Sequence, residues 1–381
     1  MNNFLIKTAL FLSATFLSVT LFAQGYTFKK VGEIRVESLA DVRIRDYDAK
    51  RKIFAGFLNK RSEGIELAIF DENGRVLTSK KREGEGPEDY RMSALTMGFS
   101  ADGNIWVQTS MELLKYDLEF NLIKKTSFEP KTTTVIYSGP RSTFVALTNA
   151  DTPSFALTIS DVSNRVGNDI IPSKTFMLDY FDANDGKIKS VIPLSARNGF
   201  KGIENEKFSS NVNAIFTSDS KKNELYFTTS LDNEITVYNP INWHVIKRIP
   251  VKHESFQALD DIPIRESNLP SMPSGGRPVL YEMNRQLLVF DDRILGLMYV
   301  KGESESMYER RKSEGQPIRF YDPDFYSLIL FKDGVQLPGE HTISTGLVEM
   351  ALPDNKLLVK ASLGDEEPDY IPFEIWQLVE N

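Results

Sequence analysis

The 381-residue chain contains no cysteine. Disulfides, thiol catalysis and zinc sites built on cysteine are therefore excluded, and so is the lipid-modified cysteine of a lipoprotein. Histidine is nearly absent as well. The placement of the three histidines, His244, His253 and His341, does not suggest a shared site. We expect them to be solvated surface residues rather than metal ligands or general bases.

The chain also lacks an excess of positive charge. Its 45 Lys and Arg residues against 53 Asp and Glu residues give a formal net charge of -8. Because nonspecific nucleic-acid binding needs a basic surface that displaces phosphate counterions, the composition argues against a nucleic-acid partner.

Long apolar runs are missing except near the N-terminus. There Lys7 precedes an apolar run over residues 9–22, and Leu21-Phe22-Ala23 resembles a small-residue cleavage site. This pattern predicts a signal peptide over residues 1–24 and a mature domain over residues 25–381 that is periplasmic or secreted. The alternative is an uncleaved membrane anchor, for which the run is shorter than the ~20 residues of a spanning helix.

Short runs with period two, rich in Val, Ile, Phe, Tyr and Thr, dominate the rest of the chain, which indicates strands. A unit of four strands with two tight turns recurs, and such a period indicates a repeat architecture. Its six copies are 52–57 with 67–74, 105–107 with 113–117, 144–147 with 177–186, 225–227 with 235–239, 294–300 with 328–334, and 357–359 with 373–376.

Four Asn-Gly or Asp-Gly pairs fall where the repeat needs a tight turn, because these residues supply the positive φ angles of two-residue hairpins. The pairs are Asn73-Gly74, Asp102-Gly103, Asp185-Gly186 and Asp333-Gly334.

The two ends of the repeat array are incomplete in complementary ways. The last copy has no fourth strand, and the strand predicted at residues 26–36 has no partner before it. Pairing these two segments would satisfy both sheet edges. We therefore predict an all-β, six-bladed β-propeller whose ring is closed by the N-terminal strand.

One blade carries a distinctive motif, Gly84-Glu85-Gly86-Pro87-Glu88-Asp89-Tyr90, followed by residues 102–107 and 114–117. This segment resembles the exported six-bladed propeller proteins common in Bacteroidota, in which a Gly-x-Gly-Pro motif precedes such a blade, and it is loosely similar to TolB-like and NHL-repeat propellers. The resemblance implies the fold and an exported location, but members of the group mostly lack an assigned activity. Many carry a lipoprotein cysteine after the signal, and this chain departs from that pattern.

The strand order of the repeat predicts two unlike faces. Tight turns join strands one to two and three to four on one face, while all other links emerge on the opposite face. The long segments 82–91, 150–175, 193–210, 252–284 and 301–317 all fall on that second face. We call it the long-loop face and expect ligand binding there, because long loops in compact folds are often functional.

Charged residues on two of these segments are the candidate ligand-binding residues, and opposite charges on the two loops would face a common opening. The candidates are Arg82, Glu83, Glu85, Asp89, Arg310 and Arg311. The alternative is that the first loop only shapes a crossover and that the basic run at 308–312 is a solvated face.

Catalytic and metal motifs are sparse. There is no Gly-x-Ser-x-Gly elbow, and Asp322-Pro323-Asp324 lacks the glycine and distal glutamate of a calcium loop, so we expect a turn before a strand. We expect no metal and no cofactor.

The leading functional hypothesis is an exported, monomeric, noncatalytic binding or scaffolding propeller that recognises a peptide, glycan or protein partner through its long-loop face. The alternative is a periplasmic or secreted hydrolase or lyase with a site at the central channel mouth, since the fold hosts both roles. A convergent set of His, Asp, Glu and Arg residues at that mouth would favour the enzyme.

Overall fold

The computed structural model describes residues 25–38, 40–60, 63–91, 94, 96–109, 111–127, 145–149, 152–157, 171–182, 187–206, 212–255, 282–317, 321–363 and 369–381. The predicted signal peptide and the predicted turn at Asp185-Gly186 lie outside these residues. Within them, no helix is long and apolar enough to cross a bilayer.

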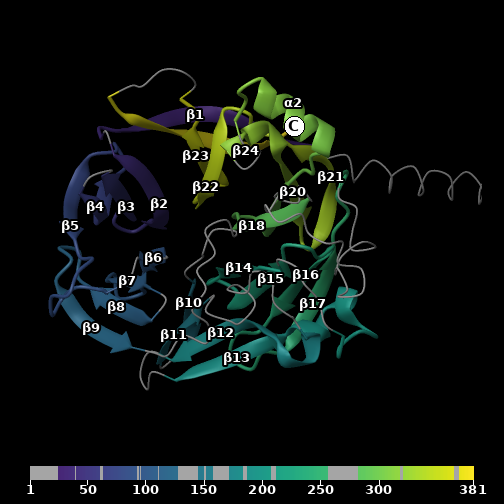
Figure 1. Cartoon of the computed structure of the whole chain (residues 1–381), viewed down its shortest axis with the longest axis horizontal. Helices are drawn as coiled ribbons and strands as arrows, with labels where there is room; N and C mark the ends of the chain where they lie inside the picture. The colour runs from purple at the N-terminus through teal and green to yellow at the C-terminus, as the bar shows by residue number, and fades with distance from the viewer. Residues whose placement is uncertain are drawn as a thin grey trace, which may run out of the picture.

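The strands form six four-stranded antiparallel sheets (Figure 1). Sheets 1 to 3 are β2 (Asp41–Asp48), β3 (Ile53–Lys60), β4 (Gly64–Asp71) and β5 (Val76–Lys81); β6 (Thr96–Phe99), β7 (Ile105–Gln108), β8 (Glu112–Tyr116) and β9 (Leu122–Ser127); and β10 (Val145–Asn149), β11 (Thr152–Leu157), β12 (Phe176–Asp182) and β13 (Ile188–Pro193).

Sheets 4 to 6 complete the set. They are β14 (Ala214–Asp219), β15 (Glu224–Thr229), β16 (Glu234–Tyr238) and β17 (Val245–Pro250); β18 (Met283–Val289), β19 (Ile294–Val300), β20 (Tyr326–Lys332) and β21 (Val335–His341); and β22 (Gly346–Leu352), β23 (Lys356–Ala361), β24 (Ile371–Glu380) and β1 (Tyr26–Val36).

The sheets are arranged around a centre, with the first strand of each sheet innermost (Figure 1). The inner strands β2, β6, β10, β14, β18 and β22 each contact the next one, and β22 contacts β2. In sheet 6 the outer strand is β1, which pairs with β24 from Tyr26 opposite Glu380 to Val36 opposite Ile371. The predicted all-β propeller fold is confirmed.

Three of the predicted tight turns are present, because Gly74, Gly103 and Gly334 adopt φ angles of 85°, 77° and 82°. Gly74 is required for a second reason. A Cβ atom there would lie 2.1 Å from the Arg35 carbonyl oxygen, so only glycine lets this turn of sheet 1 approach β1 so closely.

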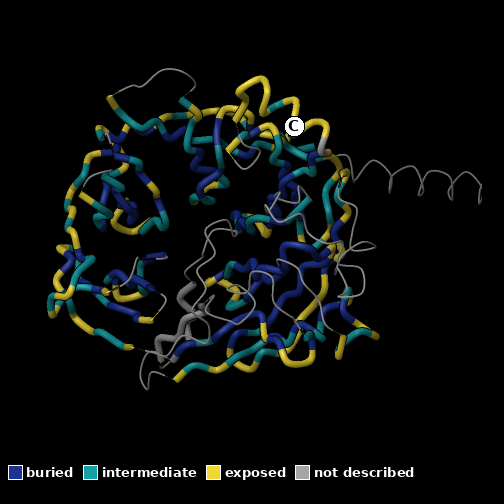
Figure 2. The backbone as a smooth tube through the Cα atoms, viewed as in Figure 1, coloured by how far each residue is buried: buried dark blue, intermediate teal, exposed yellow. Residues whose placement is uncertain are grey.

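Apolar side chains fill the spaces between adjacent sheets. Ile34 and Val36 of β1 pack with Val42, Ile44 and Phe54 of sheet 1 in one such cluster. Exposed residues concentrate on the outer strands (Figure 2). The N-terminal strand therefore contributes apolar packing to the junction between sheets 6 and 1 as well as hydrogen bonds to β24.

One α-helix and four short 3-10 helices lie in the described links between strands. Helix α2 (Glu305–Ser313) begins after Ser304, whose hydroxyl accepts a hydrogen bond from the Met307 amide and caps the helix. The 3-10 helices are η1 (Pro172–Lys174), η2 (Leu194–Ala196), η3 (Asn198–Phe200) and η6 (Pro323–Phe325). As predicted, Asp322-Pro323-Asp324 is a turn before a strand.

Candidate functional site

Three inner strands contain a β-bulge, and each bulge carries a charged residue. Pairing between β2 and β3 skips Arg45, pairing between β18 and β19 skips Arg285, and pairing between β22 and β23 skips Glu349. These strands belong to sheets 5, 6 and 1, and β22 contacts both β18 and β2. The inner strands of sheets 2, 3 and 4 pair with their neighbours in unbroken register.

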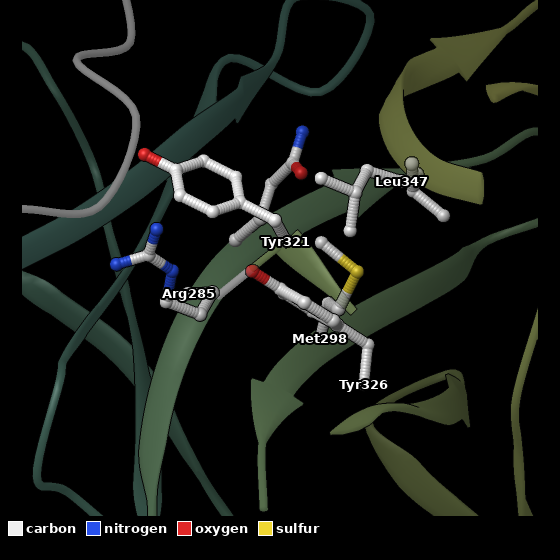
Figure 3. A pocket seen from close by; sticks show the side chains of 7 residues that line it. Arg285, Met298, Tyr321, Tyr326 and Leu347 are labelled. Carbon is white, nitrogen blue, oxygen red and sulfur yellow. The ribbon is translucent and has the colours of Figure 1, made fainter. Parts of the chain in front are cut away.

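A bulge re-aims side chains and is over-represented beside functional sites. The bulge in β18 fits this expectation, because Arg285 and Gln286 line a pocket between sheets 5 and 6 (Figure 3). The pocket has a volume of about 140 Å³. It is comparable to the ~150 Å³ cavity that accommodates a benzene ring in an engineered protein.

The pocket has a polar side and an apolar side. In Figure 3, Arg285 and the Tyr321 ring lie on one side, Leu347 lies on the other, and Met298 lies between them. Val348 is a further apolar lining residue, and Tyr326 a second tyrosine.

Strand direction places this pocket on the long-loop face. Arg285 lies near the start of β18, Met298 near the end of β19, and Leu347 near the start of β22. All three ends adjoin links between sheets or between second and third strands, which emerge on that face. The pocket thus lies beside the inner strands β18 and β22, on the face where we expected binding.

Gln286 is held in a defined orientation at the pocket. Its Nε2 donates a 2.9 Å hydrogen bond to the Glu349 carbonyl oxygen, which identifies the other terminal atom as the oxygen. That Oε1 is buried and has no hydrogen-bond partner. A buried acceptor without a donor is costly, so a rearrangement that brought a donor to this oxygen would stabilise the side chain.

Arg311 anchors the segment that carries Tyr321. Its Nη2 lies 2.6 Å from Asp322 Oδ2 and donates to the Pro317 carbonyl oxygen at 2.7 Å. Its Nε lies 3.2 Å from Glu303, and its guanidinium lies over the Phe325 ring. Arg311, a candidate ligand-binding residue, is therefore engaged within its own segment and positions the wall of the pocket.

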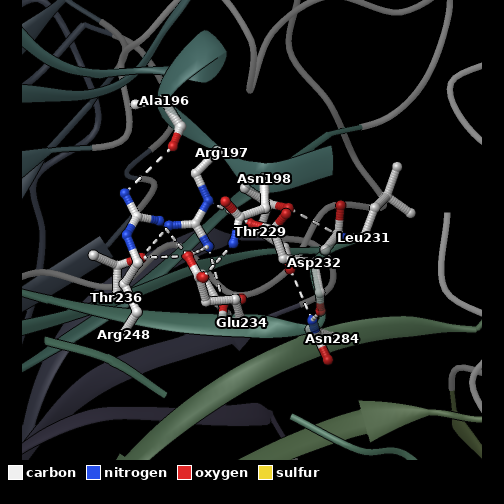
Figure 4. Close-up of polar contacts among 12 residues, drawn as sticks. Ala196, Arg197, Asn198, Thr229, Leu231, Asp232, Glu234, Thr236, Arg248 and Asn284 are labelled. Carbon is white, nitrogen blue, oxygen red and sulfur yellow. Dashed lines mark hydrogen bonds and ion pairs between the residues drawn. The ribbon is translucent and has the colours of Figure 1, made fainter. Parts of the chain in front are cut away.

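The residue before Arg285 is clamped to sheet 4 (Figure 4). Asn284 is fully buried and donates through Nδ2 to the carbonyl oxygens of Thr229 at 2.9 Å and Asp232 at 2.7 Å. Its backbone amide donates to the Ser230 carbonyl oxygen at 2.9 Å. These bonds fix the backbone from which Arg285 projects.

Asp232 is held in turn by Arg197, which follows η2 and is completely buried. Arg197 Nε donates to Asp232 Oδ2 at 2.7 Å, and Nη2 donates to the Glu234 carbonyl oxygen at 2.9 Å (Figure 4). The chain of contacts from Arg197 through Asp232 to Asn284 joins the link after sheet 3 to the start of β18.

His253 belongs to the same cluster. Its Nε2 lies 2.8 Å from Asn284 Oδ1, and because Asn284 Nδ2 already donates twice, His253 Nε2 must carry the proton. Burial lowers the pKa of His253 to about 4. The expectation of a solvated surface histidine is wrong here, and wrong for His341, whose pKa burial also lowers and whose ring packs edge-on against Phe28.

The crossover with the Gly-x-Gly-Pro motif is organised around Arg82. This buried side chain donates to the Phe120 carbonyl oxygen at 2.8 and 2.6 Å and pairs with Glu88 at 2.6 Å and Asp89 at 3.6 Å. Asp89 also accepts a hydrogen bond from the Gly86 amide. Two of the candidate ligand-binding residues thus bind each other and shape the link between sheets 1 and 2.

The remaining candidates do not converge. Glu83 is half-buried, and its backbone forms an isolated β-bridge with that of Tyr90. Glu85 is exposed, and its carboxylate lies 3.7 Å from the Arg91 guanidinium. Arg310 is exposed on α2, which belongs to sheet 5 and lies far from the crossover beside β5 (Figure 1). Among the described residues, no contact joins the two loops, so they do not face the common opening that we expected.

Sequence reasoning missed Arg285, Tyr321 and Tyr326. A charged residue that interrupts an apolar inner strand, as Glu349 does after Leu347-Val348, is a signal of a bulge, but Arg285 lies between the polar residues Asn284 and Gln286 and gives no such signal. Over the described part of the chain, no group of three His, Asp or Glu residues could hold a metal ion.

No protein-family profile and no curated protein matches the chain. Among solved structures, a member of the DUF4221 family from Bacteroides vulgatus superposes with a TM-score of 0.65 at 10% identity, covering 93% of this chain and 99% of that one. A Bacteroides fragilis protein, named as a candidate exported protein, gives a TM-score of 0.53 at 10% identity, covering 94% and 95%. At these identities the likeness shows a shared fold alone.

Proposed function

We propose that this chain is an exported, noncatalytic binding protein that holds a ring-sized group of its partner in the pocket between sheets 5 and 6. The observation that carries the proposal is the coincidence of a β-bulge, a pocket of about 140 Å³ and a long-loop position at Arg285. A concave site with an apolar wall and a few placed polar groups is the usual form of a binding site.

The lining of the pocket favours binding over catalysis. None of the seven described residues around it is a histidine, aspartate or glutamate. Those side chains supply most general acids and bases in enzymes, so the pocket contains an arginine and two tyrosines but no carboxylate or imidazole for proton transfer. The buried His253 faces Asn284 and Tyr299 instead.

The six sheets act in this proposal as the six blades of one propeller, and the pairing of β1 with β24 holds the ring closed. Two observations support closure: the unbroken cycle of inner-strand contacts and the long register between β1 and β24. Export is supported by the apolar N-terminus of the sequence and by the likeness to the Bacteroides fragilis protein.

The test is a binding screen against peptide and oligosaccharide arrays, followed by a pair of variants. Tyr321 is 69% exposed, so Tyr321→Ala should leave the melting temperature unchanged while removing the binding signal. The matched control is Val335→Ala, which removes an exposed apolar side chain of sheet 5 beside the Asp333-Gly334 tight turn, on the opposite face. Binding that survives Tyr321→Ala but is lost in Val335→Ala would contradict the proposed site.

A further inference from the structure

The pocket combines a charged group, a hydrogen-bond acceptor and an apolar wall. Together these three features restrict the class of ligand that fits it. Arg285 is its one charged side chain, Gln286 Oε1 is a buried acceptor without a donor, and Met298, Leu347 and Val348 form an apolar wall. We propose that the pocket binds the C-terminal residue of a peptide that ends in a bulky apolar side chain. This inference rests on the proposed function and specifies its ligand.

Arg285 selects for a carboxylate. A guanidinium carries five N–H donors in a fixed fork that matches carboxylate geometry, so an arginine in a pocket wall favours an anionic group. The whole chain, Arg285 included, has a formal net charge of -8 and repels anions in general. An anionic group that binds here therefore owes its affinity to this one side chain.

Gln286 would accept a hydrogen bond from an N–H group close to that carboxylate once its side chain turns toward the pocket, since Oε1 is buried in this structure. Its Nε2 is already used by the Glu349 carbonyl oxygen, so its free group is an acceptor. In the last residue of a peptide, the backbone N–H, the carboxylate and the side chain all radiate from one Cα atom. Those three groups match the acceptor, the guanidinium and the apolar wall, which all belong to residues that line the same pocket.

The apolar wall argues against a sugar as the occupant. A sugar ring carries hydroxyl groups in most directions, and those that faced Met298, Leu347 and Val348 would lose water without gaining a hydrogen bond. Each such buried hydroxyl is unfavourable. A leucine or phenylalanine side chain has no such groups and fits a cavity that accommodates a benzene ring.

The experiment measures fluorescence anisotropy of the purified exported protein with short dye-labelled peptides of randomised sequence that end in Leu or Phe. Each peptide is made with a free C-terminal carboxylate and as the C-terminal amide. Amidation should weaken binding about tenfold or more, because a hydrogen-bonded charge is lost. Arg285→Gln should weaken binding of the carboxylate form by a similar factor and leave binding of the amide unchanged, as coupled groups do.

The control variant is Arg293→Gln, which removes an exposed arginine of the same sheet on the opposite face and should change nothing. Equal binding of carboxylate and amide peptides, with binding still lost in Tyr321→Ala, would overturn this inference and leave the proposed function standing. Binding of oligosaccharides but no peptides, lost in Tyr321→Ala, would do the same. Peptide or sugar binding unaffected by Tyr321→Ala would overturn both.

Discussion

Sheets 2, 3 and 4 and sheets 5, 6 and 1 form two halves of the inner wall, and these halves differ in backbone register. The inner strands of the first half pair without interruption, whereas each inner strand of the second half contains a bulge at a charged residue. The pocket lies in the second half. Since sheets 2, 3 and 4 form with an unbroken inner-strand register, bulges in the inner strands are additions that the fold itself does not need.

The regular half supports the bulged half through buried polar contacts. Arg197 and Asp232, from the link after sheet 3 and from sheet 4, hold the start of β18 through Asn284. In the proposed function, one half supplies rigidity and the other presents side chains to the ligand. Variants of each half should separate these roles.

Deleting residues 26–36 should abolish cooperative folding or reduce the free energy of unfolding by more than about 4 kcal/mol. The deletion exposes the edge of β24 and removes the buried side chains of Ile34 and Val36 from the junction of sheets 6 and 1. Urea unfolding of the deletion variant and of the chain 25–381 measures the difference. Equal free energies of unfolding would show that β1 does not close the ring.

Arg197→Met should reduce the free energy of unfolding by about 3–5 kcal/mol, because it leaves the Asp232 carboxylate buried without its partner. Arg248→Met is the matched control. Arg248 pairs with Glu234 in the same cluster, but it is 35% exposed, so its loss should cost within about 1 kcal/mol. Similar costs for the two variants would argue against a special role for the buried pair.

Arg82→Met should reduce the free energy of unfolding by about 2 kcal/mol, since the Phe120 carbonyl oxygen loses its charged donor. Glu85→Ala and Arg310→Ala remove exposed charges and should stay within about 0.5 kcal/mol. Chemical denaturation of all three variants tests whether Arg82 shapes the crossover. If Arg82→Met left the free energy of unfolding unchanged, this arginine would again be a candidate ligand-binding residue.

Acidification should destabilise the protein through His253. The folded-state pKa of about 4 lies below the ordinary value of 6.5, so the unfolded chain binds the proton more readily and stability falls as the pH drops from 6.5 toward 4. Between pH 7 and pH 5 this contribution is about 2 kcal/mol. His253→Gln keeps a donor for Asn284 but does not titrate. The free energy of unfolding of this variant should therefore fall by about 2 kcal/mol less over the same pH range. Identical pH dependence in both proteins would contradict the assignment.

The fold could be predicted well from the sequence because short-range sequence patterns specify each repeat. Period-two strands and the pairs Asn73-Gly74, Asp102-Gly103 and Asp333-Gly334 each specify their own hairpin. The candidate site was predicted less well. A charge on a loop, such as Arg82 or Arg311, looks the same in sequence whether it binds a ligand or a neighbouring carbonyl group, and only the folded contacts distinguish the two.

The pocket itself depends on register, which is a property of paired strands. Arg285 and Leu347 are far apart in the chain and meet because β18 and β22 are neighbouring inner strands. An extra residue in a strand shifts which side chain faces the pocket, and the sequence of one strand does not reveal it.

Hydrogen–deuterium exchange of the protein with and without a bound peptide tests most directly whether the bulged half is the binding half. We predict slower exchange of backbone amides in β18, in β22 and at residues 321–326 when the peptide is bound, with β6 and β14 unchanged. Protection confined to β6, β14 or the tight turns at Gly74 and Gly103 would contradict it.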